Sequence, residues 1–193
     1  MVRERKIPSG EKACSQCTAT KNDGSRRCSR RTCLYGPMCW QHTQTRKGLK
    51  IEKSTIPGAG LGLFTTDKKE FKKNEKIDEY SGEVISKKEL DNRYPGKETL
   101  APYAIALKRH RNNTKYVDAI KSNSGMVRYA NNCRSKKDRP HCTGNNATLK
   151  DNNSQPNPSQ RKPVLKATRT IKSNTEILTS YGRNYWPRTN IRR

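Results

Sequence analysis

Five of the seven cysteines in this chain lie between Cys14 and Cys39, and His42 follows closely. The residues around them are rich in Ser, Thr, Arg and Gly, so this segment has too few apolar side chains to fold without a disulfide or a metal. The N-terminus shows no apolar stretch typical of a secretory signal, and we therefore expect an intracellular chain. In such a chain, crowded cysteines indicate a metal site rather than disulfides.

Zinc fits the spacing of these residues, because it takes four nitrogen or sulfur ligands and often has one close pair such as Cys39 and His42. The simplest ligand set is Cys17, Cys28, Cys39 and His42. Cys14 or Cys33 could replace one of them, so the spacing leaves open which four of the six residues bind. We expect one structural zinc ion in residues 14–42.

Beyond this segment, composition divides the rest of the chain. We expect a basic tail at 1–13, the zinc-binding segment at 14–42, a short basic linker at 43–49, a larger domain at 50–186 and a second basic tail at 187–193. Inside the larger domain, the Asn-, Ser-, Gln- and Pro-rich residues 151–163 predict a flexible loop.

The larger domain consists mostly of short β-type runs separated by turns. The predicted strands are 49–51, 62–65, 76–80, 82–85, 103–107, 116–119 and 164–167. One short helix is expected at 86–94, where Ser86 can act as N-cap and Glu89 follows three residues later. The sequence therefore predicts a mainly β fold.

The chain is strongly basic, with 42 Lys and Arg against 17 Asp and Glu and a formal net charge of +25. The excess is most one-sided at the two ends: residues 1–50 hold twelve basic and three acidic residues, and residues 151–193 hold nine and two. A charge of this size attracts polyanions, and nucleic acid is the commonest polyanion in cells. No apolar run is long enough to cross a membrane.

Short motifs follow one another through the larger domain. Gly60-Leu61-Gly62, in a glycine-dense turn, is weak evidence alone, because a tight hairpin turn would look the same. The later motifs are Glu79-Tyr80-Ser81-Gly82, Tyr103-Ala104-Ile105-Ala106-Leu107, Tyr116-Val117-Asp118-Ala119, Arg128-Tyr129-Ala130-Asn131-Asn132-Cys133, Asn146-Ala147 and Glu176-Ile177-Leu178-Thr179-Ser180-Tyr181-Gly182. In this order they resemble the SET-domain family of protein lysine methyltransferases, from about residue 48 to Trp186.

The resemblance implies a fold of small curved β-sheets, with a C-terminal pseudoknot that brings the Asn131 and Tyr181 segments together. It also implies S-adenosylmethionine as methyl donor. The residues that would contact this cofactor are Gly60, Leu61, Gly62, Asn131, Asn132, Tyr181 and Trp186. Tyr181 would orient the reacting groups, and Tyr103 would form a wall of the lysine channel.

The chain departs from the family pattern at three places. Asn132 and Cys133 stand where the family has His and Ser, although the amide of Asn132 can still form hydrogen bonds. No C-x-C-x4-C cluster follows Gly182, so residues 183–193 must close the site. Trp186 could either stack on the adenine of the cofactor or pack against the core. Thr179 replaces an aromatic residue beside the lysine amine, and the extra space favours di- or trimethylated product.

These observations favour a histone-type lysine methyltransferase in the nucleus, acting on a histone tail and docking on nucleosomal DNA through its basic surface. Two alternatives remain open. The chain could methylate a non-histone protein, or it could be a basic zinc-knuckle protein that binds nucleic acid and keeps a SET-like scaffold without catalysis.

Overall fold

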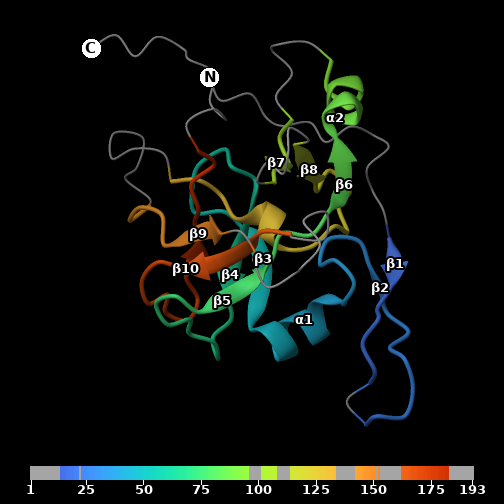
Figure 1. Cartoon of the computed structure of the whole chain (residues 1–193). Helices are drawn as coiled ribbons and strands as arrows, with labels where there is room; N and C mark the ends of the chain where they lie inside the picture. The colour runs from blue at the N-terminus through green and yellow to red at the C-terminus, as the bar shows by residue number, and fades with distance from the viewer. Residues whose placement is uncertain are drawn as a thin grey trace.

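The computed structural model describes residues 14–21, 23–95, 101–107, 114–133, 142–150, 152 and 162–182. Within these residues the fold is mainly β, with short antiparallel sheets and two α-helices (Figure 1). This confirms the predicted fold class. None of the described helices is long and apolar enough to span a bilayer.

Three sheets of three antiparallel strands make up the larger domain. The first, in the order β11-β4-β3, consists of Glu176–Ile177, Leu61–Thr65 and Leu49–Lys53. The second, in the order β5-β10-β9, consists of Lys76–Glu79, Val164–Ala167 and Ala147–Lys150. The third, in the order β6-β8-β7, consists of Glu83–Ser86, Lys115–Asp118 and Ala104–Ala106.

All seven predicted strands are present, with ends shifted by a few residues. The strands β9 and β11 were not anticipated. The helix α2 (Lys87–Arg93) confirms the predicted helix, and its capping box is formed as expected: Ser86 accepts a hydrogen bond from the backbone of Glu89, whose carboxylate accepts one from Ser86 N. Most of the loop expected at 151–163 lies outside the described residues.

A second helix, α1 (Trp40–Lys47), occupies most of the stretch expected to be a linker. It ends at Gly48, whose φ of 65° is a left-handed conformation that glycine adopts easily. A Cβ at Gly48 would lie 2.3 Å from Lys69 Cβ, so this position also needs the smallest residue for packing. The tight end of α1 leads the chain directly from the cysteine-rich segment into β3.

The main core draws buried aliphatic side chains from the first two sheets and their neighbours, including Leu49, Leu63, Leu165, Ile171 and Ile177. A separate small cluster is formed by Cys17, Ala19, Cys28 and Cys39. The cysteine-rich segment therefore has its own centre, and its strands β1 (Ser15–Gln16) and β2 (Arg31–Thr32) lie at the edge of the molecule (Figure 1).

The C-terminal strand segment passes between two earlier parts of the chain. Leu178 forms a parallel bridge with Asn131, and Thr179 forms one with Ala147. Backbone hydrogen bonds run from Thr179 N to Asn131 O and from Ala147 N to Leu178 O. The predicted meeting of the Asn131 and Tyr181 segments is thus present, and it places residues from both on one site.

Candidate active site and metal centre

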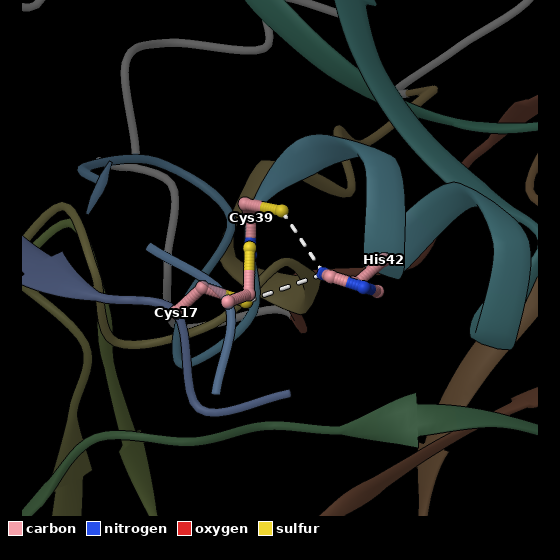
Figure 2. Close-up of side chains that lie close together, drawn as sticks. Cys17, Cys39 and His42 are labelled. Atoms are coloured by element: carbon pink, nitrogen blue, oxygen red, sulfur yellow. Dashed lines mark hydrogen bonds between the residues drawn. The ribbon is translucent and has the colours of Figure 1, made fainter. Parts of the chain in front are cut away.

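Four buried side chains of the cysteine-rich segment point toward one another. Cys17, Cys28, Cys39 and His42 offer ligand atoms that all lie within 4.8 Å of each other. His42 Nδ1 is 3.5 Å from Cys17 Sγ and 3.3 Å from Cys39 Sγ (Figure 2). Cys39 is the N-cap of α1 and His42 lies in its first turn, so the start of this helix positions both residues.

This cluster fits zinc by its chemistry and by its size. Three sulfur atoms and one imidazole nitrogen form one of the usual donor sets of structural zinc, and a tetrahedral zinc with bonds of about 2.3 Å places sulfur atoms about 3.8 Å apart. Burial raises the pKa of the Cys39 thiol, because the charged thiolate loses hydration. A dipositive ion at the centre would offset this penalty.

The other two cysteines of the segment lie outside the cluster. Cys14 and Cys33 form a disulfide with a Cα–Cα distance of 4.2 Å. The reason is the strand register: Ser15 pairs with Thr32, so the next pair along the two strands is Cys14 and Cys33. The expectation of a metal site rather than disulfides is therefore wrong for this pair. Neither Cys14 nor Cys33 belongs to the cluster of possible metal ligands. A second disulfide, Cys133–Cys142, had no counterpart in the sequence analysis.

A group of tyrosines surrounds the end of the threaded segment. The Tyr80 hydroxyl donates a hydrogen bond to Tyr103 O at 2.7 Å, and the Tyr181 hydroxyl donates one to Ala130 O at 3.1 Å. Burial raises the pKa of Tyr80 well above its usual value, and the nearby Tyr181 hydroxyl acts in the same direction. Tyr80 therefore remains a neutral hydrogen-bond donor. Sequence reasoning used Tyr80 only as part of a strand-end motif and did not place it in the site.

A buried cation lies against these rings. Arg128 is 6% exposed, and its guanidinium carbon is 4.0 Å from the centre of the Tyr103 ring and 5.3 Å from that of Tyr129. Its Nη1 donates to Ile120 O at 2.9 Å, whereas Nε and Nη2 have no hydrogen-bond partner within the described part of the chain. A fixed positive charge of this kind disfavours a second positive charge in the same space.

The glycine motif and Asn131 are joined by hydrogen bonds. Asn131 Nδ2 donates to Leu61 O at 3.0 Å and to Glu176 Oε1 at 3.2 Å, so both of its amide hydrogens are used and its side-chain oxygen remains an acceptor. A Cβ at Gly62 would lie 2.4 Å from Glu176 Oε1, which explains the need for glycine there. Glu176 was not among the predicted site residues, and its only sequence signal was its place in the last motif.

Two features leave room for a ligand beside this group. A Cβ added to Gly60 would meet none of the described residues within 4 Å, and Leu61 is 42% exposed although it is a large apolar residue. The side-chain oxygen of Asn131 and the open space fit the cofactor implied by the motifs. Asn132 lies beside Asn131, and its Oδ1 accepts from Asn145 Nδ2 at 3.2 Å.

The remaining predicted residues differ in what the structure says of them. Thr179 is 2% exposed, and its hydroxyl has no hydrogen-bond partner among the described residues. It lies next to the Asn131 segment through its backbone hydrogen bond. Trp186 lies outside the described residues.

Several solved structures of known proteins have a similar fold. Among solved structures, the methyltransferase domain of human PR domain-containing protein 2 is 17% identical with a TM-score of 0.51, over 77% of this chain and 87% of that one. A chain of the Chaetomium thermophilum polycomb repressive complex 2 is 24% identical with a TM-score of 0.54, over 72% of this chain and 16% of that much longer one. At these identities the likeness concerns the fold.

A further structure of that complex, in an autoinhibited conformation bound to S-adenosylmethionine, is 23% identical with a TM-score of 0.52, over 72% of this chain and 16% of that one. No curated protein matches the sequence. The family model for the SET domain matches residues 60–182, which is more than half of the chain and includes the glycine motif, Asn131 and Tyr181. The chain belongs to the SET-domain family.

Proposed function

We propose that this protein is an S-adenosylmethionine-dependent protein lysine N-methyltransferase. The observation that carries the proposal is the convergence of segments far apart in the sequence. Asn131 contacts the glycine motif at 60–62 through its hydrogen bond to Leu61 O. The threaded segment that ends at Tyr181 contacts the Asn131 segment through the bridge at Leu178 and the hydrogen bond to Ala130 O. Each matches a motif of the family at its own place in the chain.

The cofactor would lie against Gly60, Leu61, Gly62, Asn131, Asn132, Tyr181 and Trp186. S-adenosylmethionine supplies a methyl group on a positively charged sulfonium. The structure supports this site through the open space beside Gly60 and the exposed side chain of Leu61.

The substrate lysine must react as a neutral amine. A free lysine has a pKa of about 10.4, so deprotonation near pH 7 costs about 4–5 kcal/mol. The buried Arg128 and the aromatic rings of Tyr80 and Tyr103 reduce this cost, because both a fixed cation and loss of hydration disfavour the ammonium form.

Tyr181 orients the amine through its hydroxyl, and Tyr103 forms a channel wall. In this scheme the lysine would lose its proton to solvent. Its nitrogen would then take the methyl group as the bond from that carbon to the sulfonium sulfur breaks, which leaves a neutral thioether. Alignment in a narrow channel then supplies much of the rate enhancement.

The proposed substrate is a histone lysine in chromatin, which would place the protein in the nucleus. A histone tail is basic and a chain with a net charge of +25 would repel it, so nucleosomal DNA is needed to reverse the sign of the encounter. Related solved structures include the Chaetomium complex with H3K27me3 and H3K27M. The segment 14–42 would bind one zinc ion and support the catalytic domain at 50–186.

The test is methyl transfer from labelled cofactor to intact nucleosomes, free histones and a cell lysate. We expect labelled lysine in the wild-type product, strongest on nucleosomes at low salt. The variant Tyr181→Phe should lose turnover at least about 100-fold while keeping most of its cofactor affinity.

The matched control is Tyr35→Phe, which also removes a hydroxyl that donates to a backbone carbonyl, here Ile51 O at 3.4 Å. It should keep its activity. Absence of both cofactor binding and labelled product in the wild-type protein would favour a non-catalytic nucleic-acid-binding protein. Labelling confined to a lysate protein would favour a non-histone substrate.

A further inference from the structure

The strands β1 and β2 begin a longer antiparallel hairpin. Their register pairs Ser15 with Thr32 and Gln16 with Arg31. Backbone hydrogen bonds from Cys17 N to Arg30 O, from Cys28 N to Ala19 O and from Lys21 N to Arg26 O continue the same register. The hairpin therefore runs from 15 to 32 and turns near Asp23 and Gly24.

Alternation along the two strands gives this hairpin two different faces. The inner face buries Cys17, Ala19 and Cys28, which lie at or beside the metal cluster, and also Thr32. The exposed Arg26 and Arg30 lie on this face as well. The outer face is exposed and wholly polar, and it consists of Gln16, Thr18, Thr20, Arg27, Ser29 and Arg31. No apolar side chain interrupts the outer face.

The hairpin also carries a clear excess of positive charge. Residues 15–32 contain five Lys or Arg and one acidic residue, Asp23. The Asp23 carboxylate already accepts hydrogen bonds from Ser25 N and Ser25 Oγ, at 2.9 and 2.7 Å. By contrast, residues 51–95 contain nine Lys or Arg and nine Asp or Glu.

A basic cavity elsewhere is a weaker candidate for a polyanion. It has a volume of about 680 Å³ and lies between α1 and the β4–β5 connection. Two of its lysines are already neutralised, since Lys47 pairs with Asp78 and Lys69 pairs with Glu75, each at 2.7 Å. The cavity therefore offers a polyanion less free positive charge than its lysine content suggests.

The hairpin is held in shape by contacts with its own backbone and with α1. Arg27 donates from Nε to Cys17 O at 2.8 Å and from Nη2 to Gln16 O at 2.9 Å. Arg46 of α1 donates from Nη2 to Thr20 O at 3.0 Å. Arg31 lies on the outer face, and Arg26 lies beside the turn on the same face as Cys28. Both are exposed and form no side-chain hydrogen bond or ion pair within the described residues. They are the guanidinium groups most available to a partner.

We propose that this hairpin is a docking element for the phosphate backbone of duplex DNA. Arginine suits this partner, because its planar guanidinium donates two parallel hydrogen bonds to phosphate oxygens. A two-stranded ribbon is also narrow enough to follow the major groove. The inference deepens the proposed action on chromatin and rests on it, since it names the surface that would meet nucleosomal DNA.

The test compares two variants of the full-length protein that remove the same amount of charge. One is the double variant Arg26→Gln/Arg31→Gln, and the other is Lys53→Gln/Lys68→Gln on an exposed part of the catalytic domain. Affinity for a duplex DNA is measured by fluorescence anisotropy over a series of salt concentrations. Circular dichroism and zinc content check that each variant remains folded.

The arginine variant should reduce the slope of log affinity against log salt by about 2, since each phosphate contact contributes about 0.9. This corresponds to a loss of roughly 10- to 30-fold in affinity at 0.15 M salt. The lysine variant should change affinity by less than about 3-fold. Equal losses of affinity in both variants, or no loss in the arginine variant, would overturn the proposal. It would also be overturned if the arginine variant bound single-stranded RNA more weakly but duplex DNA as tightly as the wild-type protein does.

A DNA-free assay separates this inference from the proposed function. On a lysine peptide without DNA, the arginine variant should methylate at the wild-type rate. If both proteins are inactive on the peptide and on nucleosomes but differ in DNA affinity as expected, the docking element stands and the enzyme assignment fails. If both are active but bind DNA equally, the enzyme assignment stands and the docking element fails.

Discussion

The variant Glu176→Gln should destabilise the fold more than any surface carboxylate does. Glu176 is 5% exposed, and its carboxylate has no ion-pair partner within the described residues. Its charge is stabilised by donors from two segments. Oε1 accepts from Ser54 Oγ at 2.6 Å and Asn131 Nδ2 at 3.2 Å, and Oε2 accepts from Thr55 N at 2.8 Å and from the Thr55 hydroxyl.

The size of the effect follows from what a glutamine amide can offer at this place. Its single oxygen can replace only one of the two carboxylate oxygens. With the NH2 group at the position of Oε2, the backbone N–H of Thr55 faces a second donor. With the NH2 group at Oε1, the amide of Asn131 must rotate and break its bond to Leu61 O. Either orientation leaves one buried donor without an acceptor, and we expect a loss of about 2–3 kcal/mol in the free energy of unfolding.

Urea unfolding followed by circular dichroism measures this loss. The control is Glu75→Gln, which removes a partly exposed carboxylate that pairs with Lys69 and accepts from Lys72 N. That change should cost less than about 1 kcal/mol. If the two variants differ by less than about 0.5 kcal/mol, the stabilising role assigned to the four donors is wrong. Calorimetry should also show weaker binding of S-adenosylmethionine to Glu176→Gln, since Asn131 loses its fixed orientation.

Three further outcomes are expected. Mass spectrometry at long reaction times should show di- or trimethyl-lysine as the product of the wild-type protein. The variant Thr179→Tyr should yield mainly monomethyl-lysine, because the larger side chain fills the space of a second methyl group. Metal analysis should give about one zinc per chain, falling several-fold in Cys28→Ser and remaining unchanged in Cys14→Ser. Ser86→Ala should lower the free energy of unfolding by about 1 kcal/mol in urea, since it removes the N-cap of α2.

Much of the fold could be predicted because its signals are local. Each of the seven predicted strands contains at least one β-branched residue and is bounded by turns, and the capping box of α2 is contained in four adjacent residues. The order of the motifs then gave the family. The helix α1 was not predicted, because its sequence has no regular apolar face. It forms where His42 and Thr43 are buried against the rest of the segment.

The parts that were missed depend on contacts between distant residues. The Cys14–Cys33 disulfide follows from the strand register at Ser15 and Thr32, and cysteine spacing alone does not determine a register. The role of Glu176 depends on Ser54, 122 positions earlier in the chain. The buried position of Arg128 against Tyr103 also joins two separate motifs, each of which looked complete by itself.

The passage of Leu178 between Asn131 and Ala147 has a consequence for the order of folding. Its backbone partners on both sides must be in place before the segment 176–181 can be held, so this segment is expected to dock late. A nascent chain that has not yet reached Glu176 lacks the β11 edge of the first sheet, the Glu176 acceptor for the Asn131 amide and the Tyr181 hydroxyl that donates to Ala130 O. Cofactor binding would therefore begin only when the last sheet contact closes, and the onset of binding during refolding would measure the rate of that closure.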